Sequence, residues 1–301
     1  MSSSLLGGAL KRSAKEFQED NLTDWAATLT YYGVLSIFPA LIAIVSIAGL
    51  IGSSAIDPLT ENIGELAPGP AQEIADSALA NLKGSQGAAG LSLILSLALA
   101  IWSASAYVAA FMRASNAIYD VEEGRPVWKT LPTRIGVTLV LLVLLVAAAI
   151  GVTLTGGLAE RVAEPLGVGD QAVTVWEIAK WPVVLLAVSM ILALLYWASP
   201  NAKHPRLRWL TPGSALAVVL WLIASLAFAF YVAGFGSFNA TYGAMAAPIV
   251  FLIWLWISNV AVLLGAELNA ELERGREIGR GAPEDREPFL EPRDTRKMGS
   301  S

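Results

Sequence analysis

The sequence predicts an all-α, polytopic membrane protein with six transmembrane helices. The first observation is the stretch 209–266, where 58 positions contain no Asp, Glu, Lys, Arg or His. A helix that crosses the hydrocarbon core needs about 20 apolar residues, so this stretch accommodates two spans joined by a tight hairpin. The second observation is the composition, with 55% hydrophobic and only 15% charged residues. We therefore expect the chain to reside in a bilayer.

Four further apolar runs precede this stretch, and each is long enough to span the bilayer without a charged side chain. The six predicted spans lie at about Leu29–Ile51, Ala89–Met112, Ile135–Gly157, Trp181–Ala198, Gly213–Phe235 and Ala246–Ala270. The first begins too late for a secretory signal and lacks a small-residue cleavage site, so we expect it to be retained. Cysteine is absent, which excludes disulfide and thiolate chemistry.

The distribution of Lys and Arg predicts the orientation, because basic residues in short loops resist translocation. Seventeen of them lie before the first span, around the second and fourth loops and after the last span, against three in the alternate loops: Lys83, Arg161 and Lys180. Both termini are therefore expected in the cytoplasm. The net charge of −5 is spread over the tail and an acidic outer loop, and it indicates no particular partner.

Residues 1–27 are predicted to form a cytoplasmic amphipathic segment that precedes the six-helix domain at 28–273. Leu6, Leu10 and Phe17 recur at near-helical intervals among charged side chains, with Trp25 further along. This pattern is typical of a helix lying in the plane of the lipid headgroups. The alternative is a polar leader that frays.

Two further segments are expected outside the bilayer. Residues 53–86 carry two apolar stripes separated by Pro68-Gly69-Pro70, which predicts two short amphipathic helices over the outer mouth of the bundle. Residues 274–301 are rich in Gly, Pro, Arg and Glu and contain few apolar residues. Such a composition cannot build a core, so we expect a disordered cytoplasmic tail.

Polar residues within and beside the spans are the candidate functional positions. Asn259 is the one amide near the midplane of the sixth span, and it forms either an interhelical hydrogen bond or part of a ligand path. Pro39 removes the helical bond to the Leu35 carbonyl, which predicts a bend that is a static kink or a gate. The candidate path comprises Tyr31, Tyr32, Ser36, Pro39, Asn239, Tyr242 and Asn259. Aromatic belts account for the tyrosines without any ligand.

Small residues recur at four-residue spacing in the second and fifth spans. They include Ser92, Ser96, Ala100 and Ala104 in the second, and Gly213, Ala217, Ser225, Ala229 and Ala233 in the fifth. Small residues on one face allow helix backbones to approach closely. We interpret these rows as packing faces rather than as a pore lining.

A polar cluster is predicted at the cytoplasmic end. It comprises Arg113, Asn116, Glu267 and Asn269. Glu267 and Glu271 lie one helical turn apart and could pair with Arg113 or Arg274, or bind a cation; structural pairing is the favoured interpretation. His204, the one histidine of the chain, is interpreted as a solvated loop residue, and no metal site or cofactor is expected.

Several motifs resemble the YihY/BrkB family of bacterial inner-membrane proteins. They are Asp20-Asn21, Ala26-Ala27-Thr28-Leu29-Thr30-Tyr31-Tyr32, Leu35-Ser36 and Pro39; Asn116, Tyr119, Glu123-Gly124-Arg125-Pro126 and Trp128-Lys129; Pro212-Gly213-Ser214 and Trp221; and Tyr231, Phe235, Asn239, Thr241-Tyr242-Gly243, Leu255 and Leu264-Gly265-Ala266-Glu267-Leu268-Asn269. Together they extend over 17–273. The resemblance implies a multi-pass protein of the bacterial cytoplasmic (inner) membrane with both termini inside.

Members of this family were formerly labelled ribonuclease BN, an activity that this sequence does not support. Metal-assisted phosphodiester cleavage requires clustered His and carboxylate ligands. The chain contains a single histidine, His204. The basic loops adjoin helix ends, where topology alone explains them, so no nucleic-acid partner is expected either. The resemblance instead implies a role in envelope integrity and lipid movement, beside a large envelope-spanning lipid-bridge protein.

Three classes of function remain open at this stage. The first is a lipid transporter or flippase, or a membrane gate for a lipid-bridge partner, with membrane lipids as the ligand. The second is an ion- or proton-coupled solute transporter or channel, which normally places a charged side chain inside the bundle. The predicted spans contain none, which favours the first class. The third is a scaffold that transports nothing, and a homo-oligomer is compatible with all three.

Overall fold

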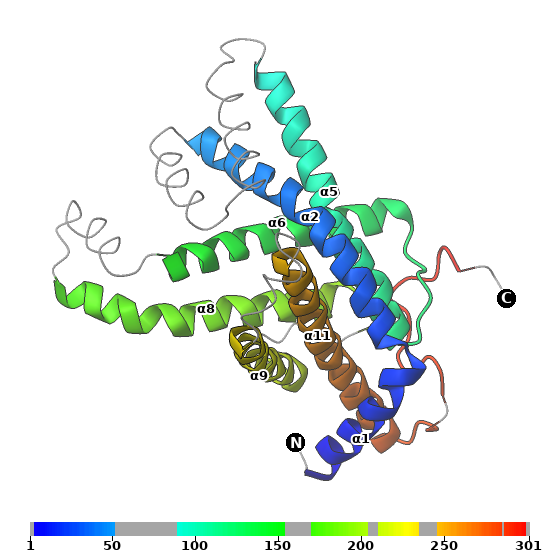
Figure 1. The fold of residues 1–301 in the computed structure, drawn as a ribbon. Helices are drawn as coiled ribbons and strands as arrows, with labels where there is room; N and C mark the ends of the chain where they lie inside the picture. Colours follow the sequence, from blue (N-terminus) through cyan, green and yellow to red (C-terminus); the bar gives the residue numbers. More distant parts are fainter. Residues whose placement is uncertain are drawn as a thin grey trace.

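The computed structural model describes residues 3–51, 89–153, 170–203, 210–234, 246–284 and 286–298. Within these ranges the regular secondary structure is helical, apart from one isolated β-bridge between Ala202 and Pro292. The helices of Figure 1 are α1 (Ser3–Glu19), α2 (Leu22–Ile51), α5 (Ala89–Ile118), α6 (Val127–Thr153), α8 (Asp170–Ala198), α9 (Pro212–Gly234) and α11 (Ala246–Gly279). The all-α prediction is confirmed for this part of the chain.

The helices pack mainly in pairs. α2 runs along α5, α6 along α8, and α9 along α11, while α1 lies against one end of α11 (Figure 1). The largest core forms where α2, α5, α8 and α11 meet, and it includes Leu29, Phe111, Tyr196 and Leu263. The rings of Phe111 and Tyr196 stack at a centroid distance of 6.2 Å, which joins α5 to α8.

Five of the described helices are long and apolar enough to cross a membrane. These candidate spans are Leu97–Ile118, Val127–Ala148, Thr174–Ala198, Pro212–Tyr231 and Pro248–Gly279, and they coincide with the second to sixth predicted spans. The first predicted span lies within α2. The count of six and the orientation with both termini inside stay predictions.

Two spans are less free of charge than the sequence indicated. α6 begins at Val127 and α8 at Asp170, so Arg134 and Lys180 lie on membrane-length helices rather than before them. Lys180 is buried and forms an ion pair with Glu177 one turn earlier on α8. Arg134 donates to backbone carbonyls of α5. Both cations are therefore tolerated because protein groups replace part of their hydration.

The amphipathic segment at the N-terminus is a helix, as predicted, and its apolar side contacts protein. Leu6 and Ala9 of α1 pack on Leu268 and Leu272 of α11, whereas Leu10 is exposed. After α1 the chain turns at Asn21, whose φ of 52° is one that Asn tolerates better than most residues. A position in the headgroup plane stays a prediction.

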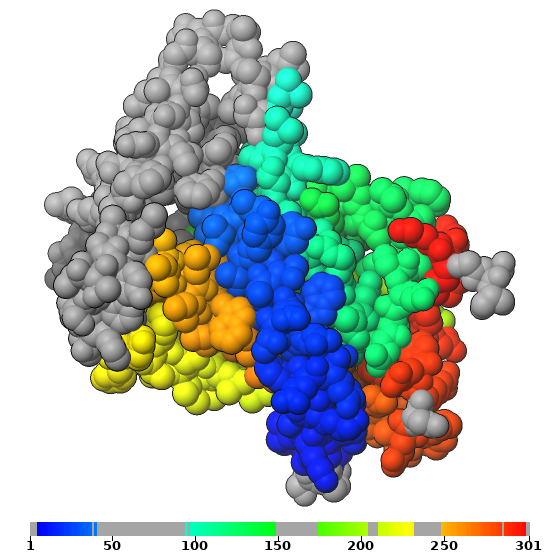
Figure 2. Space-filling model, turned by 45° about the vertical axis from the view of Figure 1, so that its right-hand side comes forward, coloured from blue at the N-terminus to red at the C-terminus, as the bar shows by residue number. Residues whose placement is uncertain are grey.

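The prediction of a disordered tail from residue 274 is wrong for the residues that the structure describes. α11 continues to Gly279, and residues 286–298 return along the loops at the same end of the bundle. Figure 2 shows this segment, in red, lying against the green start of α6 and the loop before it. Phe289 and Leu290 are buried in the main core. These two apolar side chains are enough to hold the segment in place, because the neighbouring loops form hydrogen bonds with its polar groups.

Several of the small residues form close helix contacts, whereas Ala229 is exposed. A Cβ atom added at Gly213 of α9 would lie 2.0 Å from the Gly265 carbonyl oxygen of α11, and Ala217 packs at the same crossing. Ala100 and Ala104 of α5 are also buried. The packing interpretation is therefore confirmed for these positions. The outer segment 53–86, and the hairpin residues Asn239 and Tyr242, lie outside the described residues.

Candidate functional site

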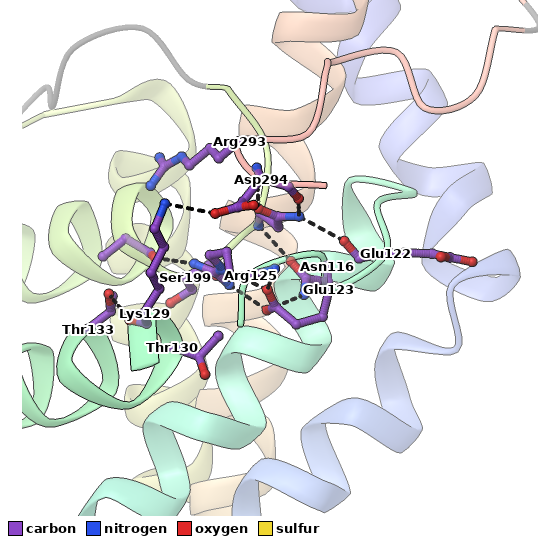
Figure 3. Close-up of polar contacts among 12 residues, drawn as sticks. Asn116, Glu122, Glu123, Arg125, Lys129, Thr130, Thr133, Ser199, Arg293 and Asp294 are labelled. Atoms are coloured by element: carbon purple, nitrogen blue, oxygen red, sulfur yellow. Dashed lines mark hydrogen bonds and ion pairs between the residues drawn. The ribbon is translucent and has the colours of Figure 1, made fainter. Parts of the chain in front are cut away.

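A network of buried polar groups ties together three segments at one end of the bundle. The segments are the α5–α6 loop (119–126), the residues after α8 (199–203) and the C-terminal segment (286–298), and Figure 3 shows their contacts. We call this end, together with α1 and the C-terminal half of α11, the polar end. The network matters for function because it sets the positions of the ends of α5, α6, α8 and α11 relative to one another.

Arg125 is one centre of this network. Its guanidinium forms an ion pair with Glu123, with Nε at 2.7 Å and Nη2 at 2.6 Å from the two carboxylate oxygens. It also donates to the carbonyls of Ala198, at 3.3 Å, and Ser199, at 2.7 Å. These are C-terminal carbonyls of α8, which lack helical partners and carry the negative end of the helix dipole. Arg125 thus caps α8 from the α5–α6 loop.

Asn201 is the second centre, and it is fully buried. Its backbone N–H donates to Asn116 Oδ1 at 2.7 Å. Its side-chain Nδ2 donates to the carbonyls of Glu122, at 3.0 Å, and Asp294, at 2.9 Å, and its Oδ1 accepts from the Asp294 backbone N–H at 3.2 Å. One amide therefore joins all three segments.

Asp294 fixes the C-terminal segment to α6. Its carboxylate accepts from Lys129 Nζ at 2.8 Å and from the backbone N–H of Arg296 at 3.1 Å. The hydrogen bond from Lys129, followed by those from Arg296, holds the pKa of the Asp294 carboxyl well below its usual range. Gly124 lies directly under this segment, because an added Cβ atom would be 2.0 Å from the Asp294 carbonyl oxygen. A side chain at residue 124 would displace the segment.

Acidic side chains gather on the other side of the polar end. Glu271 pairs with Arg12 of α1 and, at 3.5 Å, with Arg274. Glu267 is buried near Asp20, and its Oε2 has no hydrogen-bond partner among the described residues. Burial, followed by the negative charge of Asp120, raises the pKa of Asp20 to about 7. The predicted pairing of Glu271 with Arg274 is confirmed, and the pairing of either glutamate with Arg113 is not found among these contacts.

The four residues of the predicted cluster are not together. Asn116 belongs to the network of Figure 3 and Glu267 to the acidic group. Asn269 caps the start of α9, because its Oδ1 accepts from the Gly213 backbone N–H at 3.0 Å and its Nδ2 donates to Thr211 Oγ1 at 2.9 Å. Arg113 is exposed and lies over the Tyr32 ring, with 5.4 Å between its Cζ and the ring centroid.

The candidate path residues also occupy different surroundings. Asn259 is buried and makes interhelical hydrogen bonds, donating to Thr30 Oγ1 of α2 at 3.1 Å and accepting from the Tyr107 hydroxyl of α5 at 2.9 Å. Ser36 is also buried and faces the Ser103 carbonyl of α5 at 3.5 Å.

The remaining described candidates lie closer to the surface of α2. Tyr31 is 61% exposed, and the half-buried Tyr32 contacts it edge to face. α2 continues through Pro39. Among the candidates that the structure describes, Tyr31, Tyr32 and Arg113 therefore form one group at the surface.

Sequence reasoning missed Asn201, Asp294, Asp20 and Arg134. Asn201 and Asp294 are 93 residues apart and share no periodic pattern, so no sequence signal links them. Arg134 could have been found, because it directly precedes a long apolar run and so lies where a helix can already have begun. The described residues include no group of three His, Cys, Asp or Glu side chains able to hold a metal ion, and His204 lies outside them.

The helices and the polar end define an integral, multi-pass α-helical membrane protein. Within that class the chain belongs to the BrkB family, since the family model described as Virulence factor BrkB matches residues 13–288. YfkH of Bacillus subtilis (strain 168), named as ribonuclease-like, is 30% identical over 253 residues, which cover 84% of this chain and 90% of YfkH.

Two further relatives are named UPF0761 membrane proteins. The one from Azoarcus sp. (strain BH72) is 31% identical over 87% of this chain and 63% of its own length. The one from Alkalilimnicola ehrlichii is 33% identical over 86% of this chain and 57% of its own length. The chain therefore spans less than two thirds of the length of these two relatives. No solved structure matches the chain significantly.

Proposed function

We propose that the protein moves phospholipid in the bacterial inner membrane, either between leaflets or as the membrane gate of an envelope-spanning lipid-bridge protein. The observation that carries this proposal is the open apolar side of α5 and α6. Ala100 of α5 and Leu142 of α6 form a small buried contact. Near it, Leu99 of α5 is 67% exposed and Val143 of α6 is 66% exposed, and in Figure 1 the far ends of α2 and α5 diverge from α6 and α8.

Such a surface suits acyl chains. The helices are held together at the polar end by hydrogen bonds and ion pairs, while their apolar sides stay available to lipid. An acyl chain needs only apolar contact to slide along such a side, whereas a coupled ion or solute normally requires a charged group inside the bundle. On the described candidate spans, Lys180 is paired with Glu177, and Glu267 and Glu271 lie in the C-terminal half of α11, which belongs to the polar end.

A scaffold without transport is the second candidate, and one observation favours it. Both polar groups of the Asn259 side chain are taken up by Thr30 and Tyr107, so this amide is not free for a headgroup. If the scaffold role is correct, the polar end would serve only to present fixed loops to a partner protein.

We further propose that the protein is not a nuclease, although YfkH is named as ribonuclease-like. The support is chemical, because the sequence offers a single histidine and therefore no histidine cluster for a phosphodiesterase metal site. Purified protein should leave RNA intact, and cleavage that disappears with His204→Ala would contradict this.

Reconstitution tests the transport proposal. Proteoliposomes that contain a fluorescent phospholipid in both leaflets are treated with a quencher that cannot cross the bilayer. Quenching limited to the outer leaflet is expected without protein, and quenching of both leaflets is expected with protein. If the protein leaves the extent of quenching unchanged in intact vesicles, movement between leaflets is excluded. Extraction of lipid by an added acceptor then tests the gate role.

A further inference from the structure

Two arginines on neighbouring helices lack carboxylate partners. Arg113 of α5 and Arg134 of α6 make no ion pair with any residue that the structure describes. α5 packs along α6, and Arg134 reaches α5 at Trp102 and Ser105, two to three helical turns before Arg113. Two like charges near an apolar surface cost free energy unless an anion compensates them.

Each of these guanidinium groups is held in place by other contacts. Arg134 Nε donates to Ser105 Oγ at 2.6 Å and to its carbonyl at 3.1 Å, and Nη2 donates to the Trp102 carbonyl at 3.0 Å. Its Cζ is 4.9 Å from the centroid of the Trp102 ring. Arg113 rests on the Tyr32 ring and donates no hydrogen bond to a described residue. The N–H donors of the Arg113 guanidinium are therefore held in place by the Tyr32 ring and make no hydrogen bond to a described residue.

The two groups share one face of α5. Trp102, Ala109 and Arg113 recur at intervals of seven and four residues, which places them on one side of a helix. Ala109, between the two ends of this row, carries only a methyl group. An exposed aromatic ring lies near each arginine: Trp102, 51% exposed, under Arg134, and Tyr31, 61% exposed, against the Tyr32 ring on which Arg113 rests.

Ordinary snorkelling of arginine toward lipid headgroups does not account for this arrangement. A snorkelling side chain extends freely into the interface, whereas Arg134 is bound to α5 backbone and both cations are stacked on aromatic rings. Arg293, in the C-terminal segment, also donates to carbonyls and stacks on Trp197 without an ion pair among the described residues. On the described candidate spans, however, the other basic side chains are neutralised by carboxylates, as Lys129 is by Asp294 and Lys180 is by Glu177. Within these spans, the missing negative charge therefore belongs to Arg113 and Arg134.

We propose that Arg113 and Arg134 bind the phosphodiester group of a membrane phospholipid, with Tyr31 and Trp102 beside its glycerol and the acyl chains along α5 and α6. The forked guanidinium group matches phosphate oxygens in a bidentate geometry that lysine does not provide. Exposed aromatic rings at headgroup level are suited to the boundary between phosphate and acyl chain. The inference rests on the proposed function in naming a lipid as the source of the phosphate, and it assigns a residue pair to its recognition.

Native mass spectrometry of the purified full-length protein tests this site. The protein is titrated with phosphatidylglycerol and, separately, with diacylglycerol of the same acyl chains. The wild type should bind phosphatidylglycerol and not diacylglycerol. Arg113→Gln should weaken that binding on the order of tenfold, because the lost hydrogen bonds are charge-assisted. Arg113→Lys, which keeps the charge and loses the fork, should fall between the two.

Lys11→Gln is the matched control, because Lys11 is exposed on α1 and makes no ion pair with a described residue. It should bind lipid as the wild type does. Equal binding of both lipids, or equal binding by Arg113→Gln and Lys11→Gln, would overturn the site. If inorganic phosphate binds in an Arg113-dependent manner while phosphatidylglycerol does not, a free anion replaces the lipid as ligand and the proposal fails. Fold is checked by the thermal unfolding midpoint of each variant.

Binding and transport can fail independently. Arg113-dependent lipid binding without movement of lipid in proteoliposomes would keep the site and refute the transport proposal. Movement of lipid in proteoliposomes, together with equal lipid binding by Arg113→Gln and Lys11→Gln, would keep the transport proposal and refute the site.

Discussion

The substitution Asn259→Leu separates a structural from a transporting role of the midplane amide. It keeps the branched shape and the number of side-chain heavy atoms and removes the two hydrogen bonds that join α11 to Thr30 of α2 and to Tyr107 of α5. An interhelical hydrogen bond in a membrane contributes about 0.6 kcal/mol on average, and about 1.7 kcal/mol at most. We therefore expect a loss of about 1.2 kcal/mol in the free energy of unfolding.

A double-mutant cycle assigns that loss to a particular contact. Tyr107→Phe removes the donor to Asn259 Oδ1, so combining it with Asn259→Leu should cost less than the sum of the single changes by about 0.6 kcal/mol. Ser258→Ala is the control, because the Ser258 hydroxyl donates to the Trp254 carbonyl within α11 and joins no other helix. Its effect on stability should stay below about 0.5 kcal/mol.

Stability is measured by reversible unfolding in mixed micelles as the fraction of denaturing detergent rises, with tryptophan fluorescence as the signal. Lipid movement in proteoliposomes is measured on the same preparations and expressed per folded molecule. The hydrogen bonds predict lower stability and unchanged movement in Asn259→Leu. Unchanged stability together with strongly reduced movement would refute this reasoning and return Asn259 to the lipid path.

Three further predictions concern the polar end and the helix crossing. Gly213→Ala should destabilise the protein by about 1–3 kcal/mol in the same unfolding assay, because its Cβ atom meets the α11 backbone, whereas Gly136→Ala, with nothing within 4 Å, should not destabilise it. Asn201→Ala removes three side-chain hydrogen bonds and should cost about 3 kcal/mol at ~1 kcal/mol each, with protease sensitivity of the C-terminal segment rising in parallel. Asp20, whose pKa is raised to about 7 in the folded protein, contributes stability that is present below its unfolded value and lost as pH rises through about 7. The unfolding midpoint of Asp20→Asn should therefore fall less than that of the wild type between about pH 4 and pH 7; parallel pH profiles would contradict this.

The positions of the helices could be predicted from the sequence, but the ends and loops could not. Apolar runs determine where a chain can cross a bilayer, so the predicted spans coincide with α5, α6, α8, α9 and α11. Their ends were misplaced because a helix tolerates a cation wherever the fold supplies partners, as α5 carbonyls do for Arg134.

The polar end depends on contacts that carry no local signal. Asn201 meets Asp294 across 93 residues, and its role follows from loop geometry rather than from a motif. The tail was misjudged because composition counts apolar residues without regard to where they lie, and Phe289 and Leu290 happen to reach the main core. Arg113 was expected beside an acidic residue, yet Arg12 of α1 occupies that position at Glu271.

A structure of the protein in a bilayer disc of phosphatidylglycerol tests the central claim most directly. The account predicts a lipid headgroup whose phosphate contacts the guanidinium groups of both Arg113 and Arg134, with acyl chains lying along the exposed sides of α5 and α6. Guanidinium groups that instead pair with carboxylates of the protein, with no phosphate between them, would contradict it.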